Sequence, residues 1–140
     1  MITLLDTNVL IDIFVVDPTF YHASSEALRK CLQEGSLRAC EVVWAETAAR
    51  FVDQSRFRDA METLGIEFSP MDQDSAILAG VLWQNYFNSG GKKRERVAAD
   101  FLIGAHAKNH GDRLLTRDKG FFRDYFKGLT VIVPGMNTDN

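Results

Sequence analysis

Near its start the chain reads Ile2-Thr-Leu-Leu5, then Asp6, then Thr7-Asn-Val-Leu-Ile-Asp-Ile-Phe14. The first four residues are mostly apolar and stop abruptly at an acid, which predicts a short buried strand. After Asp6 the apolar residues recur at helical spacing as far as Phe14, which predicts a short helix. The stretch therefore predicts a strand, an acidic turn and a helix, an order typical of an α/β domain.

The rest of the chain continues this alternation of short strands and longer helices. Strands are predicted at about 37–40, 66–68, 113–116 and 130–133. Helices are predicted at about 20–32, 42–53, 55–64, 72–87, 97–110 and 119–126, with start signals at Asp17-Pro18, Ser55 and Asp72 and stop signals at Gly35, Gly65 and Gly111. This order predicts an α/β fold with a central, mainly parallel sheet of four to five short strands.

Length and composition indicate one globular domain over residues 1–140. The chain is 46% hydrophobic and 25% charged, close to the globular average, which argues against disorder. We find no apolar run of the ~20 residues that a membrane span requires, and no basic segment before the first apolar run, as a signal peptide would have. Cys31 and Cys40 lack metal-ligand spacing and form no disulfide framework. We expect a soluble, cytoplasmic protein.

The net charge of −3 conceals a strong asymmetry along the chain. Residues 1–90 contain 13 acids and 6 Lys or Arg, whereas residues 91–128 contain 10 Lys or Arg and 5 acids. Such a split within one domain suggests an anionic partner for the basic part. The alternative is that both sets form ordinary solvated faces.

Four acids occupy positions where a chain built only for stability rarely places them. Asp6 and Asp118 follow predicted strands, and ligands bind at the carboxyl ends of strands in open parallel sheets. Glu46 and Asp100 lie on apolar faces of predicted helices. We expect no Lys or Arg at helical spacing on the buried face of Asp100, whereas Arg50, four residues after Glu46, could pair with it. Because unpaired buried carboxylates are costly, the set needs a cation.

A hard divalent cation would neutralise all four acids at once. Mg²⁺ and Mn²⁺ prefer oxygen ligands, and four carboxylates can hold one or two such ions. Zinc fits poorly, because the three histidines are scattered and the cysteines lie elsewhere. Each acid also has an ordinary interpretation: Asp6 and Asp118 can cap the helices that follow them, and Glu46 can be a half-exposed helix residue. The four together favour a metal site.

Four blocks of the sequence resemble the signature blocks of PIN-domain nucleases, most closely the small VapC-type ribonuclease toxins of type II toxin–antitoxin systems. They are Leu4-Leu-Asp-Thr-Asn-Val-Leu-Ile-Asp12, Val43-Trp-Ala-Glu-Thr47, Ala98-Ala-Asp-Phe-Leu-Ile-Gly-Ala105 and Leu114-Leu-Thr-Arg-Asp-Lys-Gly-Phe-Phe122. The blocks stand in the family's order and span essentially the whole chain. The resemblance implies a PIN-like α/β/α sandwich.

The resemblance also implies residue roles and a reaction. The catalytic, metal-binding quartet would be Asp6, Glu46, Asp100 and Asp118. Asn8 and Thr116 would orient the acids or the waters of the metal, as residues behind a metal site commonly do. Asp12, within the first block, is interpreted as a helix surface residue. The reaction would be Mg²⁺- or Mn²⁺-dependent endonucleolytic hydrolysis of RNA that leaves 5′-phosphate and 3′-hydroxyl ends, with no dedicated general base.

The basic segment then has a predicted use in binding RNA phosphates. The candidates flank the Asp100 helix and Asp118, and they are Lys92, Lys93, Arg94, Arg96, Arg117, Lys119 and Arg123. Aromatic residues at 121–126 could stack on bases, but Phe122 and Phe126, four residues apart, are predicted to be core.

Two protein partners are expected as well. The helix at 72–87 carries more apolar surface than one buried stripe needs, which suggests a homodimer interface, as is usual in the resembled toxins. The helix at 20–32 could help form a groove for a cognate antitoxin, which in that family covers the acidic pocket.

Two other functions remain open from the sequence. One is a PIN domain that acts in RNA processing or only binds RNA. The other is a phosphotransfer domain of the haloacid-dehalogenase or receiver type, but that phosphatase needs a second acid where Asn8 stands, and a receiver needs an acidic pair and a late lysine that are not evident.

Overall fold

A computed structural model describes residues 1–92 and 94–136. At its centre is a five-stranded sheet in the order β3-β2-β1-β4-β5, with every neighbouring pair parallel. The strands are β1 (Ile2–Leu5), β2 (Ser36–Ala39), β3 (Ile66–Phe68), β4 (Arg113–Leu115) and β5 (Val131–Ile132). The predicted α/β fold with a parallel sheet is confirmed. Both edge strands are short, three residues in β3 and two in β5.

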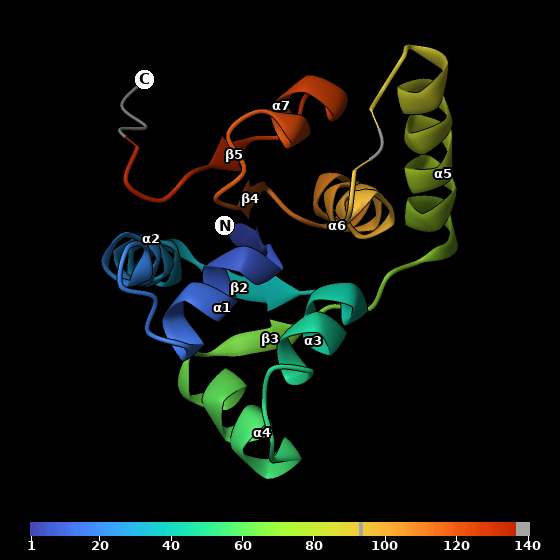
Figure 1. Ribbon diagram of the computed structural model, residues 1–140. Helices are drawn as coiled ribbons and strands as arrows, with labels where there is room; N and C mark the ends of the chain where they lie inside the picture. Colours follow the sequence, from blue (N-terminus) through green and yellow to red (C-terminus); the bar gives the residue numbers. More distant parts are fainter. Residues whose placement is uncertain (93, 137–140) are drawn as a thin grey trace.

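Seven helices connect and cover the strands in the described part of the chain. They are α1 (Thr7–Phe14), α2 (Tyr21–Glu34), α3 (Glu41–Ala48), α4 (Gln54–Thr63), α5 (Gln73–Asn88), α6 (Val97–His110) and α7 (Phe121–Tyr125). Helices α1 and α2 lie on one side of the sheet, and α5 and α6 pack together on the other (Figure 1). The sheet is therefore the middle layer of three, and parallel sheets usually need this cover on both faces.

Most helix boundaries follow the predicted signals, with four differences. Helix α2 has Phe20 as its N-cap, so the start signal at Asp17-Pro18 is wrong: the Asp17 carboxylate accepts from the N–H groups of Thr19 and Phe20 in the turn before the helix. The N-cap of α4 is Asp53, whose carboxylate accepts a hydrogen bond from the Ser55 N–H (2.8 Å), so the prediction of Ser55 as the cap is wrong. Helix α3 ends at Ala48 rather than 53, because Phe51 leaves the helix to pack edge-on against the ring of Phe14. Helix α7 is shorter than predicted, since Asp118 and Gly120 form a turn before it.

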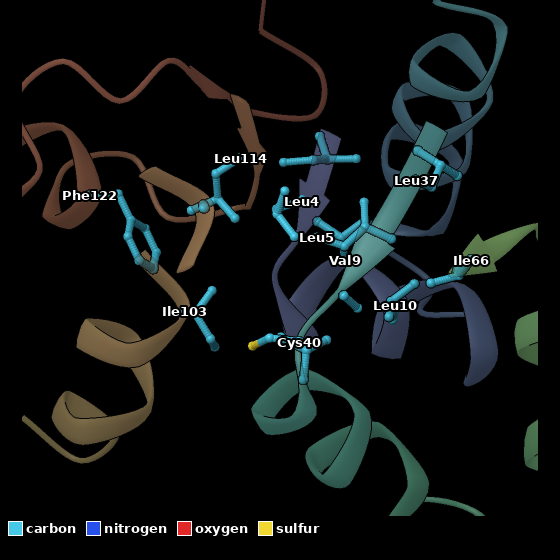
Figure 2. Close-up of a cluster of buried hydrophobic side chains, with 14 of the residues drawn as sticks. Leu4, Leu5, Val9, Leu10, Leu37, Cys40, Ile66, Ile103, Leu114 and Phe122 are labelled. Atoms are coloured by element: carbon cyan, nitrogen blue, oxygen red, sulfur yellow. The ribbon is translucent and has the colours of Figure 1, made fainter. Parts of the chain in front are cut away.

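The core lies on both faces of the central strands. Leu4 and Leu5 of β1 and Leu114 and Leu115 of β4 are at most 2% exposed. Figure 2 shows labelled core side chains contributed by four strands and by helices on either side. Phe122 is 1% exposed, and Phe126 likewise, so the prediction that these rings are core is confirmed.

The connections of β1 and β4 leave in opposite directions across the sheet. In the strand order, β2 lies next to β1 toward one edge of the sheet, and β5 lies next to β4 toward the other edge. The sheet therefore has a topological switch point between β1 and β4. The N–H of Asp6 donates to the carbonyl oxygen of Leu115 (2.9 Å), which extends the β1–β4 pairing past the end of β1. The first predicted acid is thereby held at the crevice where open α/β sheets bind ligands. No helix in the described residues has the length and hydropathy to cross a membrane.

Close packing between α6 and the segment after α7 gives a stability prediction. A Cβ atom on Gly104 would lie 2.5 Å from the buried ring of Phe126. We expect Gly104→Ala to lower the free energy of unfolding by about 1–3 kcal/mol, because overpacking outweighs the helix propensity gained. Urea denaturation measures this.

Gly80 on α5 is the matched control, since nothing lies within 4 Å of the position of its Cβ. Gly80→Ala should leave stability unchanged or raise it by up to about 1 kcal/mol. Equal effects of the two substitutions would contradict the packing argument.

Candidate active site

Asp6 sits at the carboxyl end of β1 and is 1% exposed. One carboxylate oxygen caps α1 by accepting from the Thr7 N–H (2.7 Å), so Asp6 does have the helix-capping role that its position in the sequence allowed. The other oxygen accepts from the Thr116 hydroxyl (2.7 Å) and, at 3.4 Å, from the Asn8 side-chain amide. Asn8 and Thr116 therefore do contact the first acid and fix its orientation.

Asp118 and Asp100 lie on either side of one guanidinium. Asp118 uses one oxygen to accept from the N–H groups of Gly120 (3.0 Å) and Phe121 (2.7 Å), which is the capping role. Its second oxygen accepts from Arg94 (2.7 Å), whose Nε donates to Asp100 at 2.9 Å. Asp100 is 2% exposed on α6.

Glu46, on α3, completes the group through a second arginine. Arg96 donates to both carboxylate oxygens of Glu46 (2.7 and 3.2 Å), and the Thr7 hydroxyl also donates to Glu46 (2.6 Å). The same guanidinium lies 3.5 Å from Asp100 and 3.9 Å from Asp6. The four predicted acids are thus linked through Arg94 and Arg96.

Two sequence-based expectations are wrong at this point. Arg96, four residues before Asp100, contacts it as an i,i+4 pair, although no Lys or Arg was expected at that spacing. Glu46 pairs with Arg96, and no ion pair joins it to Arg50 among the described side chains. The physical reason is that residues just before α6 continue its face, so they reach across to α3.

The two guanidiniums lie between the acids. Within residues 1–92 and 94–136, no three carboxylate, imidazole or thiol groups stand close enough together to hold a metal ion in this arrangement. A metal at this place would have to share the carboxylates with the guanidiniums or displace them.

Burial dominates the electrostatics of the two most enclosed acids. Burial raises the pKa of Asp6 to about 6, against opposing hydrogen bonding from Thr116 and the charge of Arg96. Burial also raises the pKa of Asp100, although Arg94 and Arg96 oppose the change. For Asp118 burial is outweighed, because hydrogen bonds from Arg94 and two backbone N–H groups hold its pKa below the usual value. The crevice therefore still favours additional positive charge.

Comparison with known proteins identifies the family. The family model of the PIN domain matches residues 3–127. The chain belongs to the PIN-domain family. The likeness stated from the four blocks is confirmed, and PIN domains are nucleases that generally use divalent metal ions. No sequence among the curated proteins matches this PIN domain.

Solved structures resemble it over almost their whole length. A toxin–antitoxin complex from Klebsiella pneumoniae is 26% identical, with 94% of this chain and 97% of that chain covered and a TM-score of 0.65. FitAcB from Neisseria gonorrhoeae is also 26% identical, with 96% and 98% covered and a TM-score of 0.64. VapBC2 from Rickettsia felis, bound to a promoter DNA fragment, has a TM-score of 0.73 over 96% and 99% of the chains; at 17% identity it supports the fold alone.

The predicted RNA-binding residues fall into two groups. The guanidiniums of Arg94 and Arg96 contact the acids, and Arg94 also lies over the ring of Phe121 at 4.2 Å. The remaining candidates that the structure describes are at or near the surface: Lys92, Arg117, Lys119 and Arg123. Lys93 lies outside the described residues. The rings of Phe121, Phe122 and Phe126 are buried, which leaves them unavailable for stacking on bases.

Sequence reasoning missed Asp12 and Thr7. Asp12 was interpreted as a surface residue of its helix, but it is 2% exposed and accepts hydrogen bonds from Ser24 and Arg117. Thr7 binds Glu46 through its hydroxyl. The only sequence signal for either was its position within the first block, because Arg117, which binds Asp12, and Glu46, which binds Thr7, come from distant parts of the chain.

The raised pKa of Asp6 predicts a pH dependence of stability in the metal-free protein. The folded state binds this proton more tightly than the unfolded state. Protonation of Asp6 therefore contributes to the free energy of unfolding, and this contribution is fully present below about pH 4 and is lost as the pH rises through about 6. In Asp6→Asn this dependence is absent. We therefore expect wild-type stability, relative to the variant, to fall by on the order of 2–3 kcal/mol between pH 4 and 7.

Urea denaturation at several pH values in EDTA measures the difference. Asp59→Asn, an exposed acid on α4, is the control and should track the wild type. A relative stability that stays constant or rises with pH would contradict the assigned pKa direction.

Proposed function

We propose that this PIN domain is a metal-dependent endoribonuclease and the toxin of a toxin–antitoxin pair. The observation that carries the proposal is the convergence of Asp6, Glu46, Asp100 and Asp118 at the switch point between β1 and β4. Membership in a family of nucleases supports the activity, and the resemblance to toxin–antitoxin complexes supports the toxin role. We assign the activity to the cytoplasm.

The donor chemistry fits a hard divalent cation such as Mg²⁺ or Mn²⁺. All four acids supply carboxylate oxygens, and the raised pKa values of Asp6 and Asp100 indicate uncompensated burial that a cation relieves. When bound, such an ion lowers the pKa of water and offsets charge on a phosphate.

The chain's own residues orient this site. Thr116 and Asn8 hold the carboxylate of Asp6, and the backbone N–H groups after Asp118 hold one of its oxygens. Arg94 and Arg96 keep the acids from repelling each other before an ion enters. Once released from the acids, these two arginines are available for the phosphates of RNA, together with Lys92, Lys93, Arg117, Lys119 and Arg123.

Family membership removes the basis for the phosphatase and receiver alternatives. A PIN nuclease of RNA processing is the remaining alternative. Growth arrest on expression, relieved by a small protein encoded in the neighbouring reading frame, favours the toxin; absence of arrest in several hosts favours processing.

Cleavage of RNA tests the enzyme. Wild type should cut single-stranded RNA with Mg²⁺ or Mn²⁺ and stop in EDTA, and Asp6→Asn or Asp100→Asn should lower the rate by on the order of 100-fold or more. Gel analysis of end-labelled RNA measures the rate and the ends formed, which we expect to be 5′-phosphate and 3′-hydroxyl. Asp59→Asn is the control acid. Unchanged cleavage in both site variants would refute the assignment.

A Mn²⁺ titration distinguishes the effect of the acids on metal binding from the effect of the arginines. Asp6→Asn should weaken Mn²⁺ binding, whereas Arg94→Ala should tighten it, because the guanidinium competes for Asp100 and Asp118. Weaker binding in Arg94→Ala would mean that the guanidinium and the ion do not compete.

We also propose a homodimer through α5 and an antitoxin contact along α2. On α5 the side chains of Ile77, Val81 and Phe87 are 56%, 48% and 53% exposed, and on α2 Tyr21 and Leu32 are 37% and 46% exposed. Apolar groups that cluster on one helix typically mark interaction surfaces.

The double variant Ile77→Lys/Val81→Lys should convert a dimer to a monomer, because two charges would be buried in the contact. Light scattering after size exclusion at micromolar concentration measures the mass. Val52→Lys, at a fully exposed apolar position between α3 and α4, is the control and should stay dimeric. A monomeric wild type would contradict the proposed interface.

A further inference from the structure

Asp12 is a buried carboxylate outside the acidic quartet. It lies on α1, and one of its oxygens accepts from the Ser24 hydroxyl (2.7 Å) and from Nε of Arg117 (2.7 Å). The Arg117 guanidinium also lies 4.0 Å over the ring of Phe20. A charge pair with one fully buried partner is rarely worth its desolvation for stability alone. This pair does something specific: it holds a guanidinium in one orientation.

Arg117 also lines a pocket beside the candidate active site. Arg117, Arg50 and Arg96 line a pocket of about 490 Å³, together with Glu46 and Asn8. Arg50 is exposed, and it has no acidic partner among the side chains that the structure describes. Arg96 is paired with Glu46 and Arg117 with Asp12, so Arg50 is the guanidinium that adds uncompensated positive charge to the pocket, and this charge favours an anion.

The backbone ties the pocket to the acids. Arg117 stands between Thr116 and Asp118, and its N–H donates to the side-chain oxygen of Asn8 (3.2 Å). Asp12 accepts from Nε, and no side chain in residues 1–92 and 94–136 accepts from the two terminal nitrogens of the guanidinium, so these can contact a ligand. Planar paired donors of this kind match the oxygens of a phosphate group.

We propose that Arg117 and Arg50 form a binding subsite for RNA phosphates next to the bond that is cut, and that Asp12 is the positioning residue for Arg117. The inference rests on the proposed function, which supplies the substrate class. The sequence suggested Arg117 by charge alone and Arg50 only as a partner for Glu46. The structure adds the buried carboxylate that holds Arg117 and the pocket that both arginines line. Fixing the guanidinium in advance reduces the entropy lost when RNA binds.

Binding of RNA tests the subsite without requiring cleavage. The probe is a fluorescent single-stranded RNA of mixed sequence, with anisotropy measured in EDTA at a series of KCl concentrations. Arg117→Ala should weaken binding about tenfold and reduce the slope of log affinity against log salt by about one, as loss of one phosphate contact does. Arg50→Ala should act in the same direction, and Arg56→Ala, at an exposed position on α4, should match wild type.

The positioning role of Asp12 has its own measurement. Asp12→Asn should weaken RNA binding about threefold when Arg117 is present and have no further effect in an Arg117→Ala background. Thermal unfolding and Mn²⁺ titration of each variant show whether a loss comes from folding or from the metal site. Equal weakening by Asp12→Asn in both backgrounds would make Asp12 merely structural and overturn this part.

The outcomes also separate this inference from the proposed function. If the binding effects appear but wild type cuts no RNA with any divalent ion, the subsite stands and the nuclease fails. If wild type cuts RNA while Arg117→Ala retains wild-type affinity and salt slope, the nuclease stands and the subsite is wrong, which would leave the pocket to a protein partner. A wild type that binds no RNA overturns the subsite.

Discussion

Negative charge enclosed at the ends of β1 and β4 is the constraint on which the rest of the structure depends. Asp6 and Asp100 are almost fully removed from water, and isolated carboxylates are not tolerated there without positive charge nearby. Arg94 and Arg96 meet that need from the segment before α6. Because Arg96 reaches Glu46 on α3 and Arg94 reaches Asp118 before α7, the same contacts connect three separate parts of the fold.

The sheet and most of the helices could be predicted because their signals are local. The apolar run of β1 ends at Asp6, Asp72 caps α5, and Gly111 ends α6, as expected. The start of α4 was misplaced, because Asp53 and Ser55 are both residues that cap helices and only the observed hydrogen bond decides between them. The early end of α3 depends on aromatic packing with Phe14, which comes from far away in the chain.

The site was predictable only in part, because some of its contacts join residues that are far apart in the sequence. An acid within an apolar stretch, such as Asp100, stands out in the sequence, and so does an acid directly after a strand. The arginines that neutralise them do not stand out as their partners, because Arg96 precedes the first helical residue of α6. Asp12 appeared to be a surface residue because its partner Arg117 is 105 positions away, and periodicity contains no information about such a distance.

The shortness of the outer strands affects how the molecule behaves at high concentration. With three residues in β3 and two in β5, the sheet offers few free backbone donors and acceptors along its margins. Intermolecular growth by strand addition, the common route to amyloid-like aggregates, therefore has little to build on. Because helices cover both faces of the sheet and its edge strands are short, little of its backbone is open to pairing with a strand of another molecule.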